Sequence, residues 1–157
     1  MKKVAILAVL AVFTLSCGAP KTVVETKKVL KGSWSLDNIS YSESGTFTVK
    51  LLNDTSRECF EGTMWSFTPN NNTGSYTVDN SDCPTGERNF IFAIQEIDPT
   101  TGLYDLLLKP TDEKRRSADG KGFRLNLAKM TGSQMTWEQT VSLEGKPFTI
   151  SMNFSKM

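Results

Sequence analysis

The sequence predicts an all-β protein, an antiparallel up-and-down β-barrel of eight strands or, alternatively, of nine. Apolar and polar residues alternate along most of the chain, which places one face of each strand in a core and the other in water. Turn residues recur about every ten positions, and no stretch keeps the 3.6-residue period of a helix. Short alternating strands separated by turns are typical of an antiparallel sheet that closes on itself.

The beginning of the chain has the pattern of a secretory signal. Lys2 and Lys3 precede an unbroken apolar run over residues 4–13, which is too short to cross a bilayer as a helix. Cys17 follows the small residue Ser16, and the segment resembles a bacterial lipobox, in which the cysteine is acylated and becomes the mature N-terminus. We therefore expect lipid on Cys17. The alternatives are ordinary secretion with cleavage nearby, or a retained signal.

The chain divides into three expected segments. Residues 1–16 form the lipoprotein signal peptide, residues 17–31 hold the lipidated cysteine and a short polar tether, and residues 32–157 form one barrel domain. One helical turn is compatible with residues 25–30 of the tether. A chain of this size supports a single core. Its charges nearly balance, with 18 Lys and Arg against 17 Asp and Glu, so we expect no nucleic-acid partner bound through a basic excess.

The sequence contains no histidine. This absence removes the usual general base, the Ser–His and Cys–His nucleophile pairs, and most zinc and iron sites. Carboxylates such as Glu58, Glu61 and Glu96 remain, but no two of them form a spaced pair on one strand face that suits acid–base catalysis. The sequence therefore predicts no enzyme, no metal site and no cofactor.

The predicted turns set the register of the strands, because facing residues of an antiparallel pair keep a constant sum of their numbers. Turns at 70–74, 99–101, 131–132 and 144–145, with a longer charged loop at 111–120, predict the pairings. Five strands then share one inward face. The predicted facing pairs are Val141–Phe148, Trp137–Met152, Met135–Phe154, Leu127–Met135, Leu125–Trp137, Ile94–Leu106, Phe92–Leu108, Leu108–Phe123, Trp65–Val78 and Phe67–Tyr76.

The predicted inward face is aromatic and aliphatic, which suits an apolar ligand. Gln139 is the polar side chain amid apolar neighbours, and Lys121 lies near the rim; either would orient the polar part of a ligand. In the alternative interpretation Gln139 is a buried amide satisfied by backbone or water, Lys121 is a solvated charge, and the aromatic side chains fill the barrel. The candidate apolar ligand contacts are Phe92, Phe123, Trp137 and Phe148.

Cysteine parity predicts one disulfide. An acylated Cys17 leaves Cys59 and Cys83 as an even pair for an oxidising compartment. They lie one step out of the register of the hairpin around 70–74, and a bulge at Gly62 would bring them opposite each other. We expect a structural bond that closes the open end of this hairpin. The rival interpretation is a functional dithiol, but the spacing is not that of a CxxC motif.

Residues 30–36 read LKGSWSL, and Gly32 with Trp34 resembles the GxW start of lipocalins. With the cysteine pair and the string of strands, the chain resembles the lipocalin-like lipoproteins of Bacteroidetes-type bacteria. The resemblance implies that Trp34 packs across the closed end of the barrel under a basic side chain, either Lys156 or Arg124. Further resemblance lies in ECF at 58–60, GTMW at 62–65, GSY at 74–76 and Cys83.

The strand count depends on the region after this motif. Residues 36–41 and 46–52 form either one bent strand, which gives eight, or a hairpin around 42–45, which gives nine. An even number closes an antiparallel barrel most simply. With eight strands, the long loops at 53–62, 79–88 and 111–120 share one end, which corresponds to the mouth of a lipocalin.

The resemblance implies a membrane-anchored periplasmic lipoprotein that binds or carries a small hydrophobic ligand, which enters through the long-loop end. Lys114, Arg115, Arg116 and Lys121 would suit a carboxylate or phosphate head. The alternative is an envelope interaction or structural lipoprotein with a filled barrel and a protein partner. Because residues 18–21 contain no acid, the resemblance favours a lipid anchor in the periplasmic face of the outer membrane, with the cell surface second.

Overall fold

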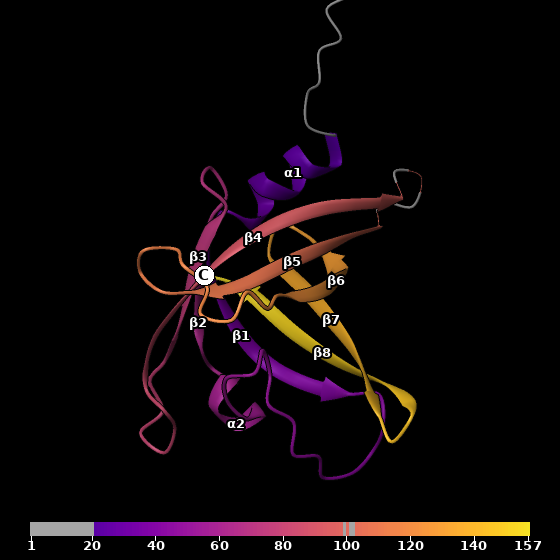
Figure 1. Cartoon of the computed structure of the whole chain (residues 1–157). Coiled ribbons are helices and arrows are strands. Elements are labelled where there is room, and N and C mark those ends of the chain that lie inside the picture. The colour runs from indigo at the N-terminus through magenta and orange to yellow at the C-terminus, as the bar shows by residue number, and fades with distance from the viewer. Residues whose placement is uncertain (1–20, 99, 101–102) are drawn as a thin grey trace, which may run out of the picture.

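The structure is a computed structural model that describes residues 21–98, 100 and 103–157 (Figure 1). The predicted signal peptide and Cys17 lie outside these residues. No helix in the described part is long and apolar enough to span a bilayer. The helices of this part are α1 (Lys21–Leu30) and α2 (Arg57–Phe60), and its strands are β1 (Gly32–Tyr41), β2 (Met64–Thr68), β3 (Thr73–Val78), β4 (Gly86–Asp98), β5 (Leu103–Thr111), β6 (Phe123–Met130), β7 (Gln134–Leu143) and β8 (Lys146–Lys156).

The eight strands form one closed antiparallel barrel. Each strand pairs with the next along the chain, and β8 pairs with β1. The predicted fold class, a lipocalin-like up-and-down barrel, is confirmed in its eight-stranded form. Residues 46–52 contribute no strand, neither as an extension of β1 nor as a hairpin. They belong to a long loop in which Leu51 and Thr55 form an isolated bridge.

Most of the predicted registers are confirmed. The turn at Glu144 and Gly145 pairs Trp137 with Met152, β4 and β5 pair Ile94 with Leu106, and the charged loop leads to the predicted pair Leu108 and Phe123. The other facing pairs predicted for these three hairpins are confirmed as well: Val141–Phe148, Met135–Phe154 and Phe92–Leu108.

Two hairpins are shifted from the prediction, β2–β3 by two residues and β6–β7 by two as far as Leu127 and by three beyond it. Leu127 faces Trp137 instead of Met135, because the turn closes later and the β6–β7 ladder is irregular between Leu127 and Lys129. Trp65 faces Tyr76 instead of Val78, because β3 begins at Thr73, directly after a turn over residues 69–72. A shift of two preserves the inward face, since side chains alternate with a period of two. The predicted pairs Leu125–Trp137 and Phe67–Tyr76 are wrong for the same reasons.

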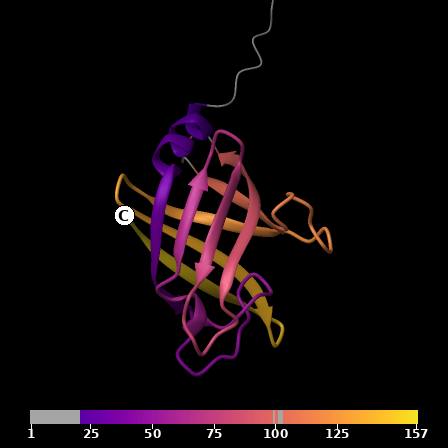
Figure 2. The ribbon, with the colours of Figure 1, turned by 90° about the vertical axis from the view of Figure 1, so that its left-hand side faces the viewer.

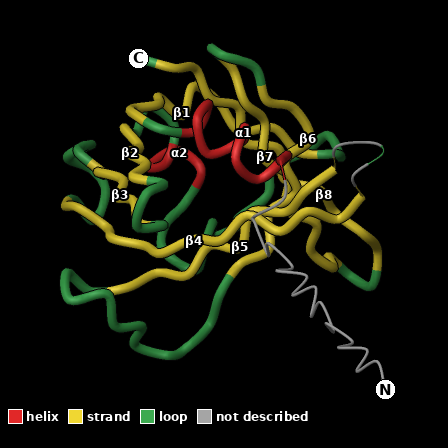
Figure 3. Tube along the Cα trace, turned by 90° about the horizontal axis from the view of Figure 1, so that it is seen from above, coloured by secondary structure: helices red, strands yellow, loops and turns green. Residues whose placement is uncertain are grey.

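Helix α1 covers one end of the barrel, as the view from above shows (Figure 3). Val23, Thr26 and Leu30 are its buried residues, and it contacts β4. Residues 21–30 were expected to be a polar tether with one helical turn, but these buried residues recur at every third or fourth position and give the helix a face that packs on the barrel.

The closed end is held by Trp34, as the GxW resemblance implied. Trp34 is fully buried, and its Nε1 donates a hydrogen bond to the Leu30 carbonyl over 2.9 Å. Lys156 supplies the basic group, with Nζ 5.3 Å from the centre of the Trp34 ring. Arg124, the alternative, instead pairs with Asp105 on the outer surface.

Candidate functional site

Aromatic side chains fill the centre of the barrel. Trp137, predicted to contact a ligand, is fully buried. The centre of its ring lies 4.8 Å from that of Phe154 and 5.6 Å from that of Trp65, which it meets edge-on at 88°. Trp65 also stacks on Tyr76, with 4.4 Å between ring centres. These contacts are typical of a packed aromatic core, and they occupy the volume that a ligand inside an eight-stranded barrel would need.

Gln139 and Phe148 lie away from the cavities described below. Gln139 is half-buried opposite Ile150, and its amide makes no hydrogen bond to another described residue. Phe148 is buried and packs against Phe47 and Tyr41, with ring centres 4.8 Å and 5.3 Å apart. Phe92, also buried, is part of the interior packing, and together with Phe123 it lines a separate hollow between β4, β5 and β6.

Helix α2 closes much of the end opposite α1 (Figures 1 and 2). The Phe60 and Leu51 side chains are fully buried there, and Leu52 is 4% exposed. Phe60 packs against Tyr76, with 5.3 Å between ring centres. The long loop between β1 and β2 thus carries apolar residues into the predicted mouth.

A cleft of about 750 Å³ remains at this end, between residues 52–54, the beginning of β4 and the β5–β6 loop. We call it the mouth cleft. Phe123 and Lys121 are the predicted ligand residues that line it. Its apolar lining comes from Leu52, Tyr76, Pro110, Ala118 and Phe123, and its charged lining from Asp54, Arg88, Asp112, Arg116, Asp119 and Lys121.

One wall of the mouth cleft is a hydrogen-bonded group of three side chains. The Tyr76 hydroxyl donates to Asp54 Oδ2 over 2.8 Å, and Arg88 Nε donates to the same oxygen over 3.1 Å. Burial raises the pKa of Tyr76, and the adjacent Asp54 carboxylate raises it further. The hydroxyl therefore stays protonated and holds the carboxylate in place.

The opposite wall is the β5–β6 loop, which is ordered by its own ion pairs. Asp112 accepts hydrogen bonds from the Arg116 amide and from Arg116 Nε, both over 2.8 Å. These bonds lower the pKa of Asp112. Lys121 Nζ lies 4.0 Å from Asp119 and stays largely exposed. Two of the four loop charges that were expected to attract an anion, Arg116 and Lys121, are thus matched by neighbouring acids.

The charge of the mouth cleft is balanced, with three acidic and three basic residues in its lining. A ligand with a full charge gains little from such a lining, because each fixed charge already has an opposite neighbour. The apolar surface of Leu52, Pro110 and Phe123 favours an apolar body. The Arg88 guanidinium and backbone groups of the loop favour a neutral hydrogen-bonding group.

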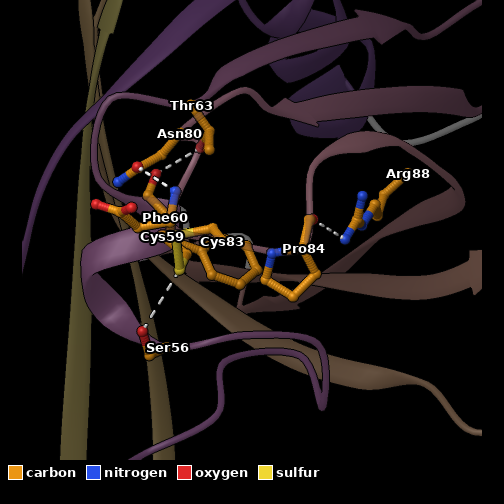
Figure 4. The surroundings of a disulfide bond; sticks show 9 residues. Ser56, Cys59, Phe60, Thr63, Asn80, Cys83, Pro84 and Arg88 are labelled. Carbon is orange, nitrogen blue, oxygen red and sulfur yellow. Dashed lines mark hydrogen bonds between the residues drawn. A yellow bond between two sulfur atoms is a disulfide. The ribbon is translucent and has the colours of Figure 1, made fainter.

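The predicted disulfide is confirmed, and it joins the two loops that frame this end (Figure 4). Cys59 belongs to α2 and Cys83 to the β3–β4 loop, with Cα atoms 5.7 Å apart. The bond was expected to join facing positions of two paired strands, but Cys59 does not lie on a strand. Gly62 has a positive φ of 86°, but its amide donates to Leu36 of β1 over 2.7 Å. A helical turn, rather than a bulged strand, therefore brings Cys59 to its partner.

Asp54 and Arg88 were missed in the sequence. Asp54 lies 22 positions before Tyr76 and 34 before Arg88, and each occupies a segment rich in polar residues. No local spacing distinguishes them from solvated charges. Closure of the barrel places the three side chains together, so a signal would require the tertiary contacts.

Of the carboxylates weighed for catalysis, Glu61 has a structural role. Glu61 Oε1 accepts hydrogen bonds from Arg57 Nε over 2.9 Å and from the Ile39 amide over 2.8 Å. Glu58 is exposed on α2, and the Glu96 side chain lies outside the described residues. Within the described ranges, no group of three or more acidic or cysteine side chains is placed to hold a metal ion.

No protein-family model matches this chain, and no curated protein matches it. Among solved structures, the chain is similar to a lipocalin-like protein from Bacteroides uniformis. The sequences are 13% identical, the match covers 82% of this chain and 99% of that chain, and the TM-score is 0.46.

Proposed function

We propose that this protein is a lipid-anchored, non-enzymatic binding protein of the bacterial envelope, which holds a small hydrophobic ligand in the mouth cleft. The observation that carries the proposal is the cleft of about 750 Å³ with an apolar lining and a charge-balanced rim. Its volume is within the range of small-molecule sites, which combine apolar surface with a few placed polar groups.

The ligand site is at the mouth because the interior is already occupied. Trp65, Trp137 and Phe60 are no more than 1% exposed and pack on one another or on Tyr76. Expelling such rings would cost several kcal/mol each. A ligand that stays in the mouth cleft requires no such change. Phe123 and Lys121 keep their predicted role, whereas Gln139, Trp137 and Phe148 serve the core and its rim.

The anchor is part of the proposal and rests on the lipobox-like segment that ends at Cys17. The periplasmic face of the outer membrane remains the proposed location. Cysteine usage supports an oxidising compartment, since Cys59 and Cys83 are paired.

A second candidate is an envelope interaction protein with no small ligand. It is favoured by the filled interior, because a barrel packed solid with aromatic rings serves as a rigid support for its loops. The two candidates differ in whether the mouth cleft takes up a small apolar molecule.

Ligand uptake is the test. Native mass spectrometry of protein purified from its own host, followed by organic extraction, should reveal a bound small molecule. Phe123→Ala should lower the affinity for that ligand about tenfold, because it removes apolar lining worth about 1–3 kcal/mol. The matched control is Phe47→Ala, an equally half-buried aromatic outside the cleft, which should retain affinity. If the organic extract of the protein is identical to a blank extract without protein, the second candidate, an envelope interaction protein with no small ligand, is favoured.

A further inference from the structure

A second hollow lies at the opposite end of the molecule, between α1 and the β2–β3 turn. It has a volume of about 440 Å³ and is lined by Val23, Val24, Lys27, Lys28, Lys31, Pro69 and Asn70. We call it the α1 pocket. Figure 2 shows α1 beside the tip of the β2–β3 hairpin, at the opposite end of the molecule from α2.

Three lysines line the α1 pocket, and two of them have no side-chain partner in the described part of the chain. Lys27 and Lys31 make no side-chain hydrogen bond or ion pair with any described residue. Lys28 pairs with Glu25 over 3.0 Å, but both side chains are more than half exposed, so that pair is weak. Glu25 is the single acid between residues 21 and 36, against four lysines. The pocket is therefore a cationic site.

The pocket also presents apolar surface. Val24 is 41% exposed on the outer side of α1, and it lies one helical turn before Lys28. Pro69 of the β2–β3 turn adds apolar lining from the barrel side. A helix that exposes an apolar residue beside lysines has the surface that lies in the headgroup region of a bilayer.

The position of the pocket brings it to a membrane if the proposed anchor is correct. Lys21, the first residue of α1, follows Cys17 by four positions. Four residues span at most about 14 Å of extended chain. The α1 pocket therefore cannot move far from the lipid that Cys17 would carry, whereas the mouth cleft lies at the other end of the barrel.

We propose that the α1 pocket binds the phosphate group of an anionic membrane phospholipid. The ammonium groups of Lys27, Lys28 and Lys31 pair with the phosphate, and Val24 contacts the acyl boundary. The inference rests on the proposed anchoring and adds orientation to it. Since lipid chains alone fix the distance from the membrane but not the angle, the bound headgroup holds the α1 end against the bilayer and turns the mouth cleft away from it.

The test is a lysine footprint of the acylated full-length product, purified from its own membranes and reconstituted in vesicles. One vesicle is phosphatidylcholine alone, and in the other phosphatidylglycerol replaces about a third of the lipid. Acetylation by a succinimidyl ester is followed at each lysine by mass spectrometry. Lys27 and Lys31 should react about fivefold more slowly in the anionic vesicle, because an anionic surface stabilises the unreactive ammonium form. Lys114 and Lys146, exposed at the far end, should react equally in both.

Matched variants separate the site from general charge. Lys28 of the unchanged protein should also react more slowly in the anionic vesicle, and in Lys27→Gln Lys31→Gln this protection of Lys28 should be lost. Lys114→Gln Arg115→Gln removes the same charge from the far end and should leave that protection intact. If the protection of Lys28 is lost in both double variants, the assignment of a defined pocket is overturned.

Two further readouts distinguish the possible failures. Equal acetylation of Lys27 and Lys31 in both vesicles, on protein that floats with the lipid, overturns the α1 pocket and leaves the anchor standing. Protein that does not float, with an unmodified Cys17 peptide, overturns the anchoring itself. Inorganic phosphate is added to the phosphatidylcholine vesicles as a third condition. If it protects the lysines as well as the anionic vesicles do, the pocket binds a soluble anion and the proposal of a phospholipid ligand is overturned.

Discussion

Lys156 of the last strand lies over the indole ring of Trp34 in the first strand, with Nζ 5.3 Å from the ring centre. The same Nζ donates a hydrogen bond to the Val29 carbonyl in the last turn of α1 over 2.7 Å. Trp34 and Lys156 also face each other in the β1–β8 ladder that closes the barrel. One cation thus joins α1, β1 and β8, and it satisfies a helix carbonyl that has no intrahelical partner.

Replacing Trp34 by Phe should destabilise the protein more than replacing Trp137 by Phe. Both indoles are fully buried, so the loss of ring volume is similar. Trp34 Nε1 donates to Leu30 and its ring receives Lys156, whereas Trp137 Nε1 has no partner among the described residues. We expect a difference of about 1–3 kcal/mol in the free energy of unfolding, measured in urea. Equal losses would show that these contacts contribute nothing beyond packing.

Lys156→Met should lower the free energy of unfolding by about 1–2 kcal/mol. It keeps the length of the side chain but removes the charge from the Trp34 ring and the donor from Val29. Lys129→Met is the matched control, because Lys129 is exposed and bonds to the exposed Gln134. Thermal unfolding by circular dichroism checks both, and a similar decrease in the two variants would contradict the role of Lys156.

Removing the disulfide by Cys59→Ser Cys83→Ser should cost about 2–4 kcal/mol, because the bond constrains the unfolded chain. It should also free α2 from the β3–β4 loop. Hydrogen exchange of the amides in residues 56–63 should therefore increase more than that of β7 and β8. Wild-type protein under reductant should behave as the double variant. If the wild type contains two free thiols as isolated, the bond is absent from the native protein.

Tyr76→Phe should change the pH dependence of stability. The pKa of Tyr76 is raised in the folded protein by burial and by Asp54, so the folded state binds its proton more tightly than the unfolded state does. The contribution is fully present below about pH 10, the pKa of tyrosine in unfolded chains, and is lost as the pH rises above it. The wild type should therefore lose stability steeply in alkali, and the variant less steeply.

At neutral pH, Tyr76→Phe should cost about 1–3 kcal/mol, because Asp54 loses a hydrogen bond. Urea unfolding at a series of pH values measures both effects. Thr77→Val is a control on the same strand, since Thr77 is exposed. If the free energy of unfolding falls with pH above about pH 10 equally steeply in the wild type and in Tyr76→Phe, the assignment of a protonated Tyr76 hydroxyl is contradicted.

The strand registers illustrate which parts of the fold follow from local patterns. The pairs around Glu144 and Gly145 follow from a tight turn whose residues are unambiguous. The β2–β3 pairs differ from the prediction by two, and the β6–β7 pairs differ by two as far as Leu127 and by three beyond the irregularity, because the loop sequence leaves the position of the turn open. Where the shift is two, the predicted inward-facing residues are still correct, since an even shift keeps every side chain on its side of the sheet.

The sequence by itself determined the class of fold, the number of strands within one and the pairing of Cys59 with Cys83, because alternation, turn residues and cysteine parity are local or countable properties. The burial of Trp34 was expected from the resemblance to the GxW start of lipocalins. The tertiary structure alone decided that the interior is filled, that α2 closes much of the mouth, and that Asp54, Tyr76 and Arg88 meet there. The physical reason is volume and closure. Alternation states which side chains point inward, but only the closed barrel shows whether rings from different strands fill the space and which distant loops come together at its end.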